Sequence, residues 1–286
     1  MKINSVKLVT FSPTGNSTKV AKAIAKGIQA PTEHIDITPP IARIRNFEEF
    51  QDELTIVASP VYVGRVPYEV AYRIRRLKAN NTPTVLVVTY GNRAYEDTLR
   101  ELGDIVTEVG FKPFAGCAFI GEHSWSIPEI PTARGRPNKD DLLIAEKFGK
   151  QIRVKLEGVS DIEKVPLVYI PGKNPYTLSL GGRNFGFDPG ELFGPITDEK
   201  LCTKCGKCVD VCPTEAVTLK RVVSNPSPRT GLNTMIVSNS EDSCVWCCAC
   251  VRACPTGARV MRPRMLEITK WLNENLGEWK EPEIYL

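Results

Sequence analysis

Residues 5–28 read SVKLVTFSPTGNSTKVAKAIAKGI. The stretch begins with a largely apolar run, which is typical of a strand buried on both faces of a parallel sheet. It ends, over 16–28, with apolar residues at three- and four-residue spacings, which predict an amphipathic helix. The short polar loop SPTGNS (12–17) joins them. A strand, a tight loop and a helix form the first part of a βαβ unit, so the stretch predicts an α/β fold.

The same alternation continues to about residue 157. Further strands are predicted by largely apolar runs and by one short β-rich segment, at 33–37, 54–60, 84–90 and 114–121. Further helices are predicted by helical periodicity at 67–79, 95–110 and 139–156. Together these elements predict a doubly wound, five-stranded parallel sheet with helices on both faces.

The rest of the chain changes character. A Gly/Pro-rich stretch contains aromatic residues that are unusual in a flexible linker, so we expect an irregular connector packed against both neighbouring units; these residues are Tyr169, Tyr176, Phe185, Phe187 and Phe193. A cysteine-rich unit follows, and a final helical pattern at 265–276 is expected to fold back as a lid or tether. The predicted division is 1–157, 158–197, 198–264 and 265–286.

Nine of the ten cysteines lie between positions 202 and 254. They form two runs with the spacing C-x2-C-x2-C-x3-C followed by Pro, which is the run used for two [4Fe-4S] clusters. Three thiolates of a run wrap around one cluster, and the fourth reaches the other. The predicted ligands of the first cluster are Cys202, Cys205, Cys208 and Cys254. Those of the second are Cys244, Cys247, Cys250 and Cys212.

Zinc is the alternative metal, although structural zinc sites usually pair their ligands across a longer gap. The register of the second run, CVWCCAC (244–250), leaves Cys248 as an extra thiol, for which we expect small apolar packing. Residues 198–262 resemble bacterial-type two-cluster ferredoxins. The long insert between Cys212 and Cys244 departs from that pattern and predicts an enlarged hairpin.

The loop 12–17 suits a phosphate, because backbone N–H groups and hydroxyls converge at a helix N-terminus. No Walker lysine follows it, and the chain contains no G-x-G-x-x-G motif. A helix cap with a turn is the simpler alternative. The loop resembles the FMN phosphate loop of flavodoxins, which implies phosphate contacts from Ser12, Thr14, Gly15, Asn16 and Ser17. Pro13 departs from that pattern by removing one backbone donor.

Two further loops follow the predicted strands that end at 60 and 90, where open α/β sheets bind ligands. By the flavodoxin resemblance, Tyr62 and either Tyr90 or Tyr95 lie against the flavin ring, and Gly64 and Gly91 let the backbone approach it. The resemblance implies further contacts from Ser59, Pro60, Val61, Thr89 and Asn92. Ordinary packing at strand ends is the alternative for each tyrosine.

His123 follows the fifth predicted strand on the same rim and is a candidate for proton transfer, with a loop hydrogen bond as the alternative role. Trp125 is expected to shield the site or to serve as packing. Arg65 and Arg93 are candidates for favouring an anionic reduced flavin, or are simply solvated.

The whole chain resembles the flavodoxin–ferredoxin fusion proteins of anaerobes. This resemblance implies FMN and two [4Fe-4S] clusters in a chain that transfers electrons internally and exchanges them with redox partner proteins. The alternatives are a flavin-dependent reductase of a small organic substrate and, less favoured, a redox sensor using Cys117 or Cys248.

Composition sets the remaining expectations. The formal net charge of +4 is small and dispersed, so we expect no nucleic-acid partner. We expect no membrane span and no signal peptide, and therefore a cytoplasmic location, in which clustered cysteines indicate metal rather than disulfides. Homo-oligomerisation stays open.

Overall fold

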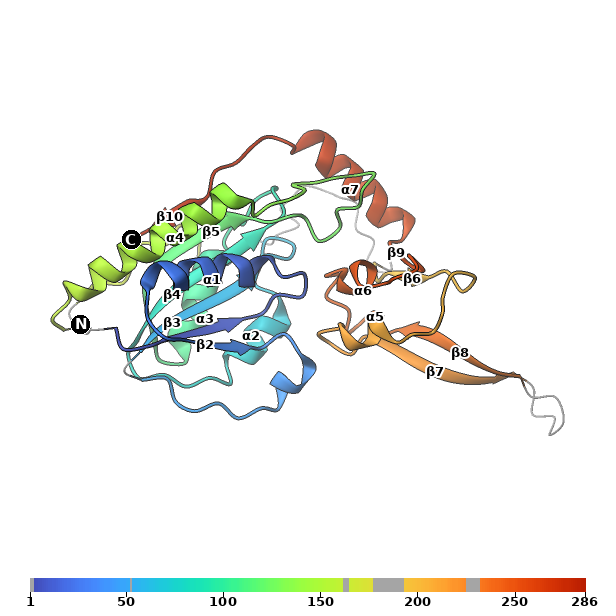
Figure 1. The fold of residues 1–286 in the computed structure, drawn as a ribbon, viewed down its shortest axis with the longest axis horizontal. Coiled ribbons are helices and arrows are strands. Elements are labelled where there is room, and N and C mark those ends of the chain that lie inside the picture. Colours follow the sequence, from blue (N-terminus) through green and yellow to red (C-terminus); the bar gives the residue numbers. More distant parts are fainter. Residues whose placement is uncertain (1–2, 52, 162–164, 177–192, 225–231) are drawn as a thin grey trace.

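The computed structural model describes residues 3–51, 53–161, 165–176, 193–224 and 232–286. An α/β unit and a smaller cysteine-rich unit lie beside each other (Figure 1). The α/β unit contains five parallel strands, β1 (Val6–Thr10), β2 (Thr32–Asp36), β3 (Leu54–Pro60), β4 (Thr82–Tyr90) and β5 (Phe111–Ile120). Their spatial order, β2-β1-β3-β4-β5, is that of a flavodoxin-like doubly wound sheet. The predicted fold class is confirmed.

A sixth strand extends this sheet beyond the five that were predicted. Strand β10 (Glu283–Tyr285) pairs antiparallel with β5 at the sheet edge, opposite residues 116–118. Three residues are too few to show a strand period, and the pairing joins segments far apart in the sequence. Local patterns therefore could not have predicted this strand.

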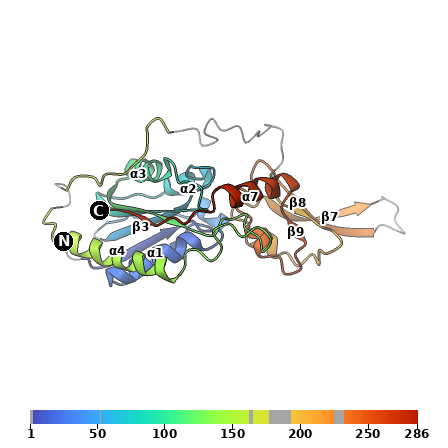
Figure 2. The same cartoon turned by 90° about the horizontal axis from the view of Figure 1, so that it is seen from above.

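Helices cover both faces of the sheet, with α1 (Asn16–Ile28) and α4 (Lys139–Glu157) on one face and α2 (Tyr68–Ile74) and α3 (Thr98–Glu108) on the other (Figure 2). Helices α1 and α4 approach each other backbone to backbone. A Cβ atom added at Gly27 would lie 2.0 Å from the carbonyl oxygen of Glu146, and one at Gly149 would lie 2.1 Å from that of Ile24. Glycine at both positions is therefore a packing requirement, because any side chain would push the helices apart.

Helix α2 is shorter than the predicted span 67–79. It ends at Ile74, and a tight turn follows. Beyond the turn, the Ala79 N–H donates to the carbonyl of Val109 at 2.8 Å, and the Asn80 N–H donates to that of Phe50 at 3.1 Å. These long-range bonds pull the chain out of the helix, which overrides the local helical pattern. A 3-10 turn, η1 (Pro40–Arg43), follows β2.

Several described residues of the connector pack against the α/β unit. The Tyr176 hydroxyl donates to Asp104 at 2.8 Å, and Ile170 is buried. Phe193 is buried against aromatic residues of both units. Tyr169, in contrast, is 79% exposed, so its side chain is not part of the packing between the connector and the rest of the protein. Phe185 and Phe187 lie outside the described residues.

The cysteine-rich unit contains two short helices and two small antiparallel sheets. These elements are β6 (Ile196–Thr197), α5 (Lys207–Asp210), β7 (Val217–Ser224), β8 (Leu232–Asn239), α6 (Ala249–Arg252) and β9 (Arg259–Val260). Strands β7 and β8 form the predicted hairpin, whose turn lies outside the described residues. The hairpin projects away from the α/β unit (Figure 1).

The C-terminal segment returns to the α/β unit. Helix α7 (Pro263–Asn275) runs above the junction of the two units, and the tail then crosses to β10 (Figure 1). Asn92 Nδ2 donates to the carbonyls of Leu276 at 2.7 Å and Glu278 at 2.9 Å. The Arg136 guanidinium lies 3.9 Å from the ring centroid of Trp279. The chain beyond α7 is therefore tethered to the α/β unit by these contacts. In the described part of the chain, no helix has the length and apolar character needed to cross a membrane.

Replacing Asn92 with Gly should release this tail. The variant loses two partly buried side-chain hydrogen bonds but still tolerates the left-handed backbone at this position, where φ is 66°. We expect the free energy of unfolding in a denaturant titration to fall by about 1–3 kcal/mol. Gln29→Gly is the matched control, because Gln29 is exposed and has a φ of 60°. An equal effect in both variants would contradict the tethering role.

Candidate functional site

A cavity of about 1000 Å³, its open mouth included, lies at the carboxyl ends of the parallel strands. Loops that follow β1, β3, β4 and β5 line it on the side of the α/β unit, and residues 245–246 and α7 line it on the other side. In open α/β sheets, ligands bind at this edge, where the strand order reverses. Here the edge is covered by a second unit, so the cavity is shared between the two parts of the chain.

The loop 12–17 forms one end of the cavity. Ser12, Thr14, Asn16 and Ser17 line it together with Pro13. Gly15, with φ of 87°, is the N-cap of α1, and the Ser12 hydroxyl accepts a hydrogen bond from the first-turn N–H of Thr18 at 3.2 Å, so the cap and turn raised as the alternative are present. An anion at this helix end would use the remaining first-turn N–H groups, those of Asn16 and Ser17. The Ser17 hydroxyl lies 2.6 Å from the Thr89 hydroxyl, which fixes the loop against the end of β4.

The loop after β3 carries a tyrosine to the boundary between the units. Pro60, Val61 and Tyr62 line the cavity, whereas Ser59 and Gly64 are not among the lining residues. Tyr62 also packs against the buried residues Val245, Cys247 and Ala249. Burial, together with nearby thiols, raises the pKa of Tyr62 well above its ordinary value, so the phenol stays neutral. One aromatic ring thus contacts both the cavity and the second cysteine run.

Some residues of the loop after β4 line the cavity, and others contact the C-terminal tail. Thr89, Tyr90 and Gly91 line the cavity, and burial raises the pKa of Tyr90 to about 12. Asn92 instead donates to the tail, as described above. The Tyr95 hydroxyl lies 2.8 Å from the Tyr285 hydroxyl and donates to Glu283 at 2.7 Å. The structure therefore brings Tyr90 to the cavity and places the side chain of Tyr95 against β10.

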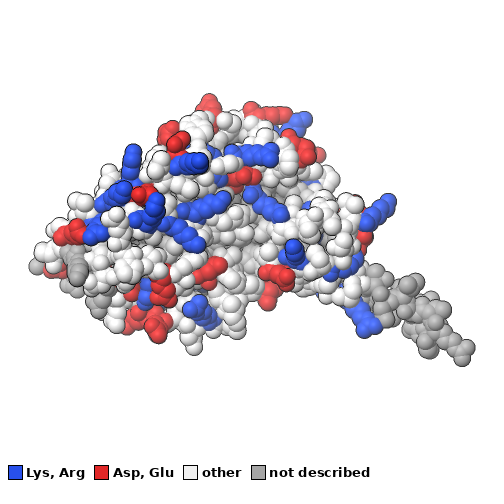
Figure 3. Space-filling view, in the orientation of Figure 1, with Lys and Arg blue, Asp and Glu red and all other residues white. Residues whose placement is uncertain are grey.

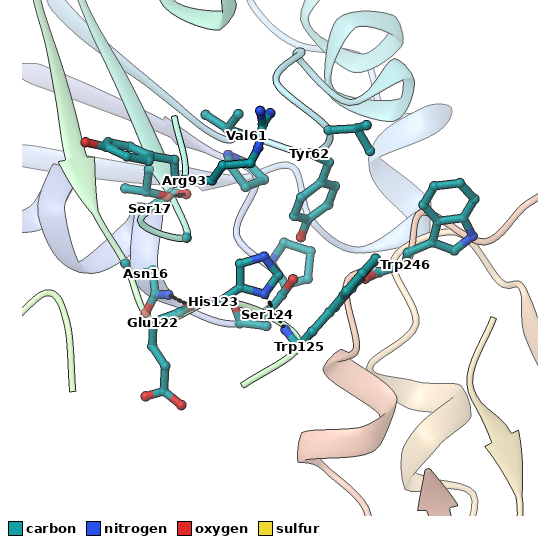
Figure 4. A pocket seen from close by; sticks show the side chains of 18 of the residues that line it. Asn16, Ser17, Val61, Tyr62, Arg93, Glu122, His123, Ser124, Trp125 and Trp246 are labelled. Atoms are coloured by element: carbon teal, nitrogen blue, oxygen red, sulfur yellow. Dashed lines mark hydrogen bonds between the residues drawn. The ribbon is translucent and has the colours of Figure 1, made fainter. Parts of the chain in front are cut away.

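The loop after β5 contributes His123 and Trp125, which lie together near the cysteine-rich unit (Figure 4). His123 Nδ1 accepts a hydrogen bond from the Trp125 backbone N–H at 3.1 Å. Burial lowers the pKa of His123 to about 4, and the cations of Arg252 and Arg93 contribute to this shift. The imidazole is therefore neutral at neutral pH. A loop hydrogen bond, the alternative raised from the sequence, is present, and a proton-transfer role stays a prediction.

The two arginines near the predicted flavin loops differ in position. Arg93 lines the cavity and forms an ion pair with Glu96 at 2.5 Å. Arg65 is not a lining residue, and its guanidinium binds Glu101 with N–O distances of 2.6 and 2.8 Å. Only Arg93 is therefore placed to face a ligand.

The cysteine-rich unit and α7 supply the wall that sequence reasoning did not assign to this site, namely Val245, Trp246, Ile268 and Leu272. Trp125 Nε1 donates to the Trp246 carbonyl at 2.7 Å, across the junction of the units. Ile268 and Leu272 are four residues apart on one face of α7, and this spacing is the signal that could have assigned the helix, predicted as a lid or tether, to this particular cavity. Figure 4 shows Trp246 on the segment that faces Tyr62 and Trp125.

The predicted ligands of the first cluster surround one cavity of about 300 Å³, its mouth included. Cys202, Cys205, Cys208 and Cys254 all line it, although Cys254 lies 46 residues beyond Cys208 in the chain. Cys205 is exposed, Cys202 and Cys254 are half-buried, and Cys208 is buried. Within the described residues, no three His, Cys, Asp or Glu side chains converge closely enough to hold a single metal ion.

The other four thiols form a second group that is more deeply buried. Cys212 and Cys250 share one buried cluster with Cys208 of the first group, and Cys244 packs against it. Burial raises the pKa of Cys244 to about 11, with contributions from Cys250 and Cys212. Burial also raises the pKa of Cys247, and the thiols of Cys250, Cys244 and Cys212 contribute. Cys254 lies with the first three cysteines of the other run, and the assignment of ligands to each cluster stays a prediction.

Residues 201–258 match the 4Fe-4S dicluster domain family. The chain joins a flavodoxin-like domain to a 4Fe-4S dicluster domain. No curated protein sequence matches the chain.

Solved flavodoxin structures are similar to the N-terminal half of this fusion. A flavodoxin from the domain Archaea is 13% identical over 54% of this chain and 99% of its own, with a TM-score of 0.36. Oxidised flavodoxin 1 from Bacillus cereus is 15% identical over 55% and 99%, with a TM-score of 0.35. Flavodoxin from Fusobacterium nucleatum, bound to flavin mononucleotide, is 15% identical over 55% and 98%, with a TM-score of 0.33. The flavodoxin-like assignment rests on the strand order.

The two remaining cysteines of the fusion are buried. Cys248, with φ of 53°, packs with Met261, Met265 and Ile268, which agrees with its predicted apolar role. Cys117 is fully buried in β5, and burial raises the pKa of its thiol. Neither thiol has the exposure that a redox sensor requires.

Replacing Gly91 with Ala should disturb the cavity. A Cβ atom there would lie 2.2 Å from His123 Cδ2, so the imidazole must move. We expect the free energy of unfolding to fall by about 1–3 kcal/mol, and a crystal structure to show a displaced His123 ring. Gly116→Ala is the matched control, because its nearest neighbour would lie at 3.6 Å. An unmoved imidazole in Gly91→Ala would contradict this packing.

Proposed function

We propose that this fusion is an electron-transfer protein that pairs an FMN in the shared cavity with two [4Fe-4S] clusters in the dicluster domain. The observation that carries the proposal is the position of Tyr62, whose ring contacts both the cavity and the buried loop around Cys247. A flavin site and a cluster site separated by one side chain suit internal electron transfer better than two sites on independent domains.

The residues of each site have the chemistry needed to bind the group proposed for it, namely the clusters at the cysteines and FMN in the shared cavity. Eight cysteines with the dicluster spacing, in two groups of four, would hold the clusters. The first-turn N–H groups of α1 and the hydroxyls of the loop 12–17 would bind the FMN phosphate, and Tyr62 and Tyr90 would face its ring system. When bound, FMN accepts one or two electrons and each cluster exchanges one.

The exposure of the two thiol groups supports an order of access. The first group opens to solvent through Cys205, whereas the second is buried beside the shared cavity. Trp125, Trp246 and α7 cover the cavity on the side of the dicluster domain. We therefore place the contact with an external redox protein at the first group. The face in Figure 3 carries interspersed positive and negative side chains, so it does not favour a strongly charged partner. A reducing, cytoplasmic location is part of the proposal.

A second candidate is a flavin-dependent reductase of a small organic substrate. The observation in its favour is that His123 lines the same cavity as the phosphate loop. With a pKa of about 4, His123 is a poor imidazolium acid at neutral pH but remains able to hydrogen-bond a ligand. Substrate turnover by dithionite-reduced protein would favour this candidate over the electron carrier.

Anaerobic purification and cluster reconstitution test the proposed function directly. We expect about eight iron atoms per chain, an equal amount of sulfide and one extractable FMN. After reduction of the clusters with a rapid one-electron donor, stopped-flow spectra should show first-order flavin bleaching whose rate is independent of protein concentration. A rate that rises with protein concentration would indicate transfer between chains and contradict the internal route.

Two neighbouring cysteines give a sharp test of the ligand register. Cys247→Ala should remove one cluster and about half of the iron, whereas Cys248→Ala should retain the full iron content. Both thiols are buried, so the pair is matched in burial and in chemistry. Iron and sulfide analysis with electron paramagnetic resonance (EPR) of the reduced protein would measure the difference. Loss of iron from Cys248→Ala alone would show that the register is wrong.

A further inference from the structure

Arg259 in β9 is a buried cation between the two thiol groups. Its residue exposure is 3%. Its Nη2 donates to Cys250 Sγ of the second group at 3.6 Å, and the same residue lines the cavity of the first group. One guanidinium therefore reaches both groups.

The other contacts of Arg259 are neutral. Nη2 also donates to Asn239 Oδ1 at 2.9 Å, and Nη1 donates to Thr197 Oγ1 at 2.7 Å. Nε is buried and has no hydrogen-bond partner within the described residues. These contacts fix the side chain and leave the Nε–H without a partner among the described residues.

The two other buried arginines each have a carboxylate partner. Arg73 lies 3.0 Å from Glu69, and Arg136 lies 2.5 Å from Asp141. For Arg259, no carboxylate of the described residues lies within ion-pair distance. A buried charge without a counter-ion is strongly destabilising. The arrangement thus indicates that an anion belongs beside Arg259.

We propose that Arg259 is the shared counter-ion of both clusters and sets their reduction potentials. The inference rests on the proposed function, because it requires the clusters to be bound. With four thiolates, each oxidised cluster carries a formal charge of about −2 and gains one negative charge on reduction. A buried cation and N–H groups directed at sulfur stabilise the reduced form more than the oxidised form. Both potentials are therefore higher than they would be without Arg259.

An anaerobic redox titration monitored by EPR tests this role on the reconstituted full-length protein. Arg259→Gln removes the charge and keeps a planar polar group, so we expect both cluster potentials to become more negative. Arg264→Gln is the matched control, since Arg264 lies near the start of α7 with its side chain 36% exposed and its charge is screened by solvent. Its two potentials should equal those of the unaltered protein.

Arg259→Lys is a second test variant, needed if Arg259→Gln does not retain its clusters. It keeps the charge but lacks the planar set of N–H donors, so both potentials should lie between those of the unaltered protein and those of Arg259→Gln. Unchanged potentials in an Arg259→Gln protein that holds both clusters would overturn the proposal. If only the Lys variant holds them, unchanged potentials there would overturn it. Absence of clusters from the unaltered protein would instead overturn the proposed function.

Discussion

The reversal of strand order between β1 and β3 is the constraint on which the site depends. Strand β1 is hydrogen-bonded to β2 on one side and to β3 on the other, so the connections that leave it and β3 diverge to opposite faces of the sheet. A crevice opens where they diverge. The loop 12–17 and Tyr62 both lie at this crevice. Each binding feature of the flavodoxin-like domain is therefore a consequence of sheet topology.

A crevice on an isolated domain would open to water, and three kinds of contact close this one. Arg73, fully buried in α2, donates to the carbonyl of Pro213 at 2.5 Å, next to the cysteine that crosses between the two thiol groups. Trp125 bonds the Trp246 carbonyl near the centre of the junction. The tail beyond α7 joins the far edge of the sheet. Together these contacts hold the dicluster domain against the cavity. The fold therefore fixes the distance between the dicluster domain and the proposed flavin site.

Local patterns predicted most of the fold because most of its elements are decided locally. Helix α1 begins and ends at the predicted residues, since a polar loop and an apolar period define it. The cysteine spacing likewise predicted two groups of four thiols. The early end of α2, strand β10 and the turn of Tyr95 toward the tail were not predicted, because each follows from hydrogen bonds to segments distant in the sequence. Arg259 escaped notice for the same reason: only folding places it between two cysteine runs.

The burial of charge distinguishes the shared cavity from the two thiol groups. At the cavity, the ionisable side chains that approach it are neutral or paired: His123 and Tyr62 are uncharged, and Arg93 binds Glu96. At the thiol groups, Arg259 is charged and has no carboxylate beside it among the described residues. A buried cation favours the arrival of an electron in its surroundings, whereas neutral groups leave that balance to the ligand itself. On the proposed function, the dicluster domain would therefore adjust the potentials of its clusters through a protein charge, and the flavodoxin-like domain would contribute mainly shape and exclusion of water.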